Sequence, residues 1–203
     1  MKKTLFVLPF TALLLAGCGG SPQSTPTAPT VEPATSSQTP SASQTASAAS
    51  EAKSSRGNLV KKVGEGISVM DKDKAVASFV INSIEVDPQC TGTSASPAAN
   101  GNFVALDVSM ETTPELANSV YPEFGLAGQA WKAIADNGTT YNGSLFSMES
   151  IMCFPDTERF PSALGPGEKA TGKIVLDVPT PTGVLVHKQG FMPAGWEWEY
   201  PAK

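Results

Sequence analysis

The stretch FVALDVSM, residues 103–110, decides the fold that we expect for this chain. Val104, Leu106, Val108 and Met110 occupy every second position, and polar or smaller residues stand between them. Because side chains alternate along a strand with a period of two, the four apolar side chains lie on one side. The stretch therefore predicts a β-strand that is buried on one face.

Other short apolar runs surround this strand, and clusters of Gly, Pro and Asn separate them. No stretch of helical length has a 3.6-residue apolar period. The change of face at 82–83 predicts a bulge, Asn137-Gly138 suits a tight hairpin turn, and 113–121 form one helical turn or none. Roughly seven to nine short strands over about 140 residues are typical of an antiparallel β-sandwich. The expected strands are 67–70, 76–86, 103–110, 131–135, 139–141, 172–178, 184–187 and 196–200.

The N-terminus carries an export signal that ends in Leu15-Ala16-Gly17-Cys18. Two lysines, an apolar run and small residues follow one another as in a secretory signal, and the run is shorter than the ~20 apolar residues of a membrane-spanning helix. The four residues resemble the lipobox of bacterial lipoproteins, in which the cysteine receives a diacylglyceryl group and the signal is cut just before it. We expect residues 1–17 to be a signal peptide and Cys18 to carry acyl chains such as palmitate. An ordinary signal with a chance cysteine is the alternative.

Residues 18–62 connect the lipidated cysteine to the folded part. Most of them are Gly, Ser, Pro, Thr, Ala and Gln, and this composition cannot bury enough apolar surface to offset the entropy of ordering. Residues 51–62 are a short charged stem. We therefore expect a disordered linker, then a domain over 63–203, held through the lipid on the extracytoplasmic face of the cell membrane.

The charge is modestly acidic, with 14 Lys and Arg against 19 Asp and Glu. Removing Lys2 and Lys3 with the signal leaves 12 against 19, a net charge of −7. An acidic surface argues against nucleic acid or anionic lipid as the main partner. We expect a monomer whose partner, if it has one besides the membrane, is an envelope protein or a glycan.

Two cysteines remain once Cys18 is assigned to lipid. In an exported, oxidising setting Cys90 and Cys153 are expected to form a disulfide. It would close a loop of about 64 residues and contribute roughly 4 kcal/mol. A catalytic thiol would need a base, for which His187 is the single histidine, and a metal site would need four ligands at short spacings. No metal or cofactor is expected.

Several landmarks fall in one order: GNFVALDV at 101–108, DNG at 136–138, GPGE at 165–168, and Gly172 with VLDVP at 175–179. This order resembles the DUF4352 family of bacterial lipoproteins and exported proteins, whose immunoglobulin-like sandwich is related to secreted mycobacterial antigens of the MPT63 type. The resemblance implies that fold over 63–200 and brings no catalytic residues. A long excursion at 143–163 and the cysteine pair depart from it.

Two functions of different class stay open. The first is a non-catalytic domain for binding or envelope support, in which Trp196, Trp198 and Tyr200 form an aromatic row that could stack on a ligand. At this alternating spacing we favour the core-facing side of the last strand instead.

The second function is a small cell-wall hydrolase or its accessory, using Glu149, Asp156 and Glu158 of the 143–163 excursion. We interpret His187 as the outward end of a strand, so no catalytic centre is built on it. Asp71 lies in a polar turn rather than a calcium loop. We therefore expect that the chain is not an enzyme.

Overall fold

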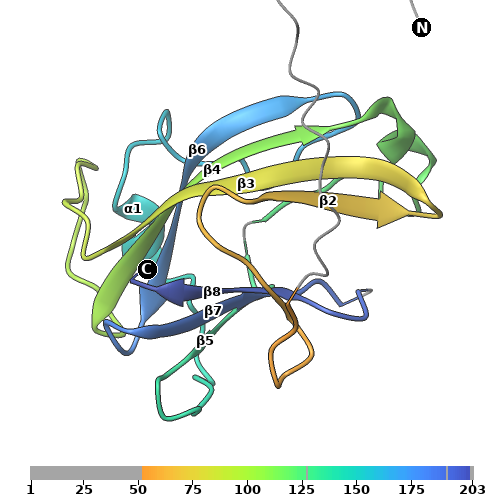
Figure 1. The fold of residues 1–203 in the computed structure, drawn as a ribbon. Coiled ribbons are helices and arrows are strands. Elements are labelled where there is room, and N and C mark those ends of the chain that lie inside the picture. The colour runs from red at the N-terminus through yellow and green to blue at the C-terminus, as the bar shows by residue number, and fades with distance from the viewer. Residues whose placement is uncertain (1–51, 127, 191, 202–203) are drawn as a thin grey trace, which may run out of the picture. The chain divides into compact units, whose positions relative to one another are not determined.

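The alternating strands form two layers in the computed structural model, which describes residues 52–126, 128–190 and 192–201. One layer, the β4 sheet, has the strand order β2-β3-β4-β6, and the other, the β8 sheet, has the order β1-β8-β7-β5 (Figure 1). All neighbours are antiparallel except β1, which is parallel to β8. The expected all-β sandwich is confirmed. The strands are β1 Leu59–Val60, β2 Gly66–Asp71, β3 Lys74–Val86, β4 Asn102–Thr112, β5 Trp131–Ile134, β6 Lys169–Val178, β7 Gly183–His187 and β8 Trp196–Tyr200.

The core lies between the two sheets. Val104, Leu106 and Val108 of β4 are almost completely buried, as the alternation of FVALDVSM predicts. Phe79 of β3 meets Trp196 of β8 edge to face, with ring centroids 5.3 Å apart. Aromatic contacts of this kind contribute beyond the burial of area, so the long strands of one sheet are fixed against the last strand of the other.

Most predicted strands are present, some of them with longer bounds. The register of β3 against β4 shifts between Ile81 and Ser83, which confirms the bulge. The second arm of the predicted 131–141 hairpin is reduced to one bridge between Ile134 and Thr140. Two short helices complete the described chain: η1, a 3-10 turn at Pro114–Asn118, and α1 at Met148–Met152. No helix among the described residues is long and apolar enough to cross a membrane.

The charged stem is part of the fold. Arg56 donates two hydrogen bonds to the carboxylate of Glu197, from Nη2 at 2.8 Å and Nε at 3.2 Å, and Asn58 donates a third. Leu59–Val60 then pairs with β8. The folded part thus begins before residue 63, because the stem supplies the cation and the amide that bind the buried carboxylate of Glu197. The predicted signal peptide, Cys18 and the linker up to residue 51 lie outside the described residues.

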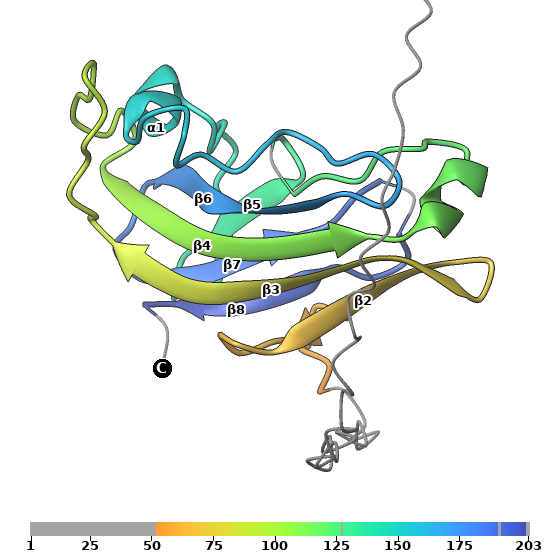
Figure 2. The same cartoon turned by 90° about the horizontal axis from the view of Figure 1, so that it is seen from above.

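The 143–163 excursion covers part of the outer face of the β4 sheet. Phe103, Ala105 and Val175 point outward from β4 and β6 and pack with Cys153 and Phe154 of the excursion in a small second core. Figure 2 shows α1 of this excursion at one end of the β4 sheet and η1 at the other. The two ends of the sheet therefore differ: one is capped, and the other is flanked by η1.

Candidate functional site

An apolar groove lies at the η1 end of the sandwich, and we call it the end groove. It is formed by the last residues of β2 with the turn after them, the segment 116–124, and Met192 with Pro193 before β8, and its volume is about 440 Å³. Volumes of this size are typical of sites that take a small ligand or an anchoring side chain.

The floor of the end groove is hydrophobic core. Val69, Val76, Leu116 and Phe124 line it, and each exposes 5% or less of its surface. Phe124 also stacks on Phe79, with ring centroids 6.4 Å apart. A group that enters the groove therefore contacts packed apolar side chains rather than a polar surface.

The rim of the end groove is apolar and exposed. Val120 exposes 82% of its surface, Tyr121 73% and Met70 55%. These three make up half of the large hydrophobic residues that are exposed in the described chain. Because folded monomers rarely gather exposed apolar side chains around a cavity without a function, this clustering marks the groove as a candidate binding site.

The segment that carries the rim is held at both ends. Thr113, before η1, donates from its backbone N–H to Val76 and from its hydroxyl to Ala75. Ser119 donates to Asp71 Oδ2 at 2.7 Å, and Phe124 exchanges two backbone hydrogen bonds with Leu164. Residues 120–123 lie between these fixed points, so their apolar side chains are presented by a preformed loop.

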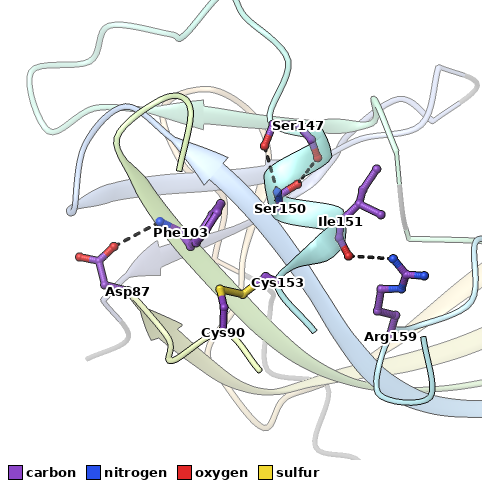
Figure 3. The surroundings of a disulfide bond; sticks show 8 residues. All are labelled: Asp87, Cys90, Phe103, Ser147, Ser150, Ile151, Cys153 and Arg159. Atoms are coloured by element: carbon purple, nitrogen blue, oxygen red, sulfur yellow. Dashed lines mark hydrogen bonds between the residues drawn. A yellow bond between two sulfur atoms is a disulfide. The ribbon is translucent and has the colours of Figure 1, made fainter. Parts of the chain in front are cut away.

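The disulfide between Cys90 and Cys153 is confirmed (Figure 3). It joins the 87–102 loop to the C-terminal end of α1, and the Cys153 side is fully buried. The backbone N–H groups of Thr91 and Gly92 donate to the carbonyl of Cys153 at 2.9 Å. The bond and these contacts hold the excursion on the sheet, as expected for a long loop that is stapled down.

Two of the three carboxylates proposed for hydrolysis are engaged with cations. Glu158 accepts from Lys173 of β6 at 2.9 Å, and Asp156 pairs with Arg159. Arg159 also donates to the carbonyl of Ile151 at 2.8 Å. Glu149 lies in the first turn of α1. Two of the three carboxylates thus tie the excursion together, and this arrangement gives no support to a pair of positioned catalytic carboxyl groups.

The aromatic row of the last strand is core. Trp196, Trp198 and Tyr200 expose 4%, 2% and 2% of their surfaces. Trp196 and Trp198 pack on Phe79 of β3, with ring centroids 5.3 and 6.5 Å apart, so the row faces the β4 sheet. The alternative of a ligand-binding row on the surface is therefore wrong, and the core-facing side that we favoured is the correct one.

His187 is buried, so its interpretation as the outward end of a strand is wrong. The imidazole lies next to Trp131 in β5 and Trp196 in β8, at 4.8 and 6.1 Å between ring centroids. Neither ring nitrogen has a hydrogen-bond partner in the described structure. Burial lowers the pKa of His187 to about 4. The reason is the register: His187 shares the inward face with Leu185, two residues earlier.

The part of the chain that the structure describes contains no group of His, Cys, Asp and Glu side chains that could hold a metal ion. Asp71 ends β2, and Lys72 and Asp73 form the tight turn after it with φ values of 48° and 66°. The polar turn expected there is present.

The comparisons with known proteins include a solved structure with a similar fold. It is the crystal structure of MPT63, a secreted protein of Mycobacterium tuberculosis, which shares 16% sequence identity with this chain at a TM-score of 0.47. The match covers 70% of this chain and 97% of that chain. No family model and no curated protein matches. The relation to the DUF4352 family stays a prediction, and no site residue or activity comes from this likeness.

The sequence patterns did not point to the end groove. Val120-Tyr121 is an apolar pair in a segment for which we expected one helical turn or none, and it has no alternation that would assign it a face. The pair lies between two prolines of a non-strand segment, Pro114 and Pro122, and this isolation was the one available signal for an exposed apolar site.

Proposed function

We propose that this chain is a lipid-anchored, extracytoplasmic protein whose β-sandwich is a non-catalytic module that binds another envelope component through the end groove. The observation that carries the proposal is the exposure of Val120 and Tyr121 around a floor of core residues. Tyr and Met are enriched in protein interfaces, and anchors of this kind contribute most of the binding energy when they are buried.

The anchor is supported by the lipobox resemblance of Leu15-Ala16-Gly17-Cys18. Two acyl chains on one cysteine give stable membrane attachment, because each buried methylene contributes about 0.8 kcal/mol. Cys18→Ala is expected to move the protein from the membrane pellet to the soluble fraction of disrupted cells. Continued sedimentation of the variant with the membranes would overturn the anchor.

The binding role is tested by chemical crosslinking on intact cells. The wild-type chain is expected to give an adduct with another envelope component, and the pair Val120→Ser and Tyr121→Ser is expected to lose it. Met148→Ser is the matched control, since Met148 is 63% exposed on α1 at the other end of the sheet. Equal thermal unfolding of all variants excludes misfolding as the cause.

Two outcomes would contradict the proposal. Adduct formation that survives the groove pair, or that Met148→Ser removes equally, would place binding elsewhere. An adduct made of two copies of this chain would mean that the groove mediates self-association and does not bind a different envelope component.

A further inference from the structure

The end groove has an unequal set of charges at its mouth. Asp71 and Glu123 line it, against a single cation, Lys72. Lys74, next along the hairpin, is paired with Glu115 at 2.7 Å and belongs to that ion pair. The groove thus combines an apolar floor with a mouth in which carboxylates outnumber ammonium groups.

We infer that the ligand of the end groove is a protein segment in which an apolar anchor side chain is flanked by Lys or Arg. This inference rests on the proposed function and names the class of partner. The apolar part fills the space over Val69, Val76 and Phe124, and the flanking cation lies at Asp71 and Glu123. Complementary charge of this kind selects the partner and steers its approach more than it adds affinity.

The two carboxylates are placed to receive a cation. The hydrogen bond from Ser119 is made to Oδ2 of Asp71, and it fixes the orientation of that carboxylate at the rim. Glu123 is exposed and stands two residues after Tyr121, whose exposed ring offers a second attraction for a Lys or Arg side chain. The cation and the apolar anchor of the ligand segment therefore bind next to each other.

The floor favours a protein segment over a glycan. Hydroxyl groups that enter the groove would lose water and meet Val69, Val76, Leu116 and Phe124, which offer no side-chain hydrogen bond in return. A Leu, Met or Phe side chain gives up no hydrogen bond to water in the same place and gains the burial of its apolar surface. Met70 and Met192 at the rim adapt their shape to different anchors.

The test uses three labelled synthetic peptides, KLFLK, SLFLS and ELFLE, titrated with the full chain by fluorescence anisotropy. KLFLK is expected to bind about two- to fivefold more tightly than SLFLS at low salt, which is the range of an exposed ion pair, and ELFLE more weakly than both. The preference is expected to shrink at about 1 M salt, where charges are screened within ~3 Å.

Variants assign the effect to the groove. Glu123→Gln is expected to reduce the preference for KLFLK and to leave SLFLS unchanged, whereas Glu85→Gln, an exposed glutamate at the far end of β3, is expected to change neither. Val120→Ser is expected to weaken the binding of all three peptides.

The outcomes separate the inference from the proposed function. Equal binding of the three peptides, with Val120→Ser still weakening them, overturns the charge inference and leaves the groove as a binding site. Peptide affinities that Val120→Ser leaves unchanged, or peptides that do not bind at concentrations up to about 1 mM, overturn both the charge inference and the proposed function. Competition by maltohexaose but not by unlabelled KLFLK would mean that the groove binds a glycan and not a protein segment.

Discussion

At the scale of single residues, His187 is the least satisfied polar side chain of the described core. It is completely buried against Trp131 and Trp196, and both ring nitrogens lack a partner among the described residues. Burial lowers its pKa from 6.5 to about 4, because the imidazolium would lose its hydration and gain no acceptor. The folded protein therefore holds a neutral imidazole at neutral pH.

Acid is expected to destabilise the fold through this residue. Between about pH 6.5 and pH 4 the unfolded chain binds a proton at His187 that the folded chain does not, so the free energy of unfolding falls as the pH falls through this window. The loss is about 3 kcal/mol when complete. Urea unfolding at pH 7 and pH 4.5 measures most of it. His187→Phe is expected to remove this part of the pH dependence.

The comparison is clean because His187 is the single histidine of the chain. Carboxylates add their own acid sensitivity, but they do so in the wild type and in the variant alike. Identical pH dependence of the two proteins would mean that the folded state accepts the proton on His187.

Asp177 is the opposite case, a buried carboxylate with a full set of donors. Its oxygens accept from the backbone N–H groups of Ala99 and Asn100 at 2.9 Å and from the hydroxyl of Ser147 at 2.6 Å. These donors come from the 87–102 loop and the 143–163 excursion. One side chain of β6 thus joins both segments of the cap to the sheet.

Asp177→Asn is expected to lower the free energy of unfolding by about 2–3 kcal/mol. The amide group that replaces one oxygen turns a donor toward Ala99 or Asn100, and one partly buried backbone N–H is left without its acceptor. Asp73→Asn, in the exposed β2–β3 turn at φ 66°, is the control and is expected to change little. Chemical denaturation of the two variants compares them, and equal stability would contradict the role of Asp177.

At the scale of elements, β1 shows how a two-residue strand can matter. It covers the edge of β8, and the stem before it brings Arg56 and Asn58 to Glu197, which is only 4% exposed. Removing the partners of a buried charge usually destabilises by about 3–5 kcal/mol. A chain that begins at residue 63 loses both partners at once.

A chain beginning at residue 63 is therefore expected to be less stable than one beginning at residue 52, by about 3 kcal/mol or more. Glu197→Gln in the shorter chain is expected to recover part of the loss, because an amide is less costly to bury than a carboxylate. Thermal unfolding of the three chains measures this order. Equal melting temperatures for the two lengths would show that the stem adds no stability.

The sequence predicted every described strand of four or more residues, because alternation or an apolar run can be read at that length. β4 and β6 have 11 and 10 residues, so their alternation is readable and their bounds were close. β1 has two residues and α1 five, too few for any period to show. The inward face of His187 was missed for a related reason: β7 has five residues, of which Val184 alone is not fully buried, and burial on both sides hides the alternation.

At the scale of the whole domain, the two ends of the β4 sheet have different consequences for stability and binding. The capped end is closed by the disulfide, by the Asp177 network and by a second core around Phe103 and Phe154. The η1 end keeps its apolar side chains exposed around the end groove. The contacts that stabilise the fold and the exposed side chains that are available to bind a ligand therefore lie at opposite ends of the sheet.

The disulfide tests this separation. It links residues 63 positions apart, and the enclosed segment includes β4, β5 and α1, which belong to both sheets and the cap. Removing it frees the unfolded chain of that constraint, which costs about 4 kcal/mol in the loop-entropy account. In the double variant Cys90→Ala and Cys153→Ala, the free energy of unfolding measured in urea is expected to fall by this amount. The variant is nevertheless expected to bind KLFLK as the wild type does under native conditions. Cys18→Ala is the control that removes a cysteine and keeps the bond. Lost peptide binding in a folded double variant would mean that the cap and the end groove are coupled across the sheet.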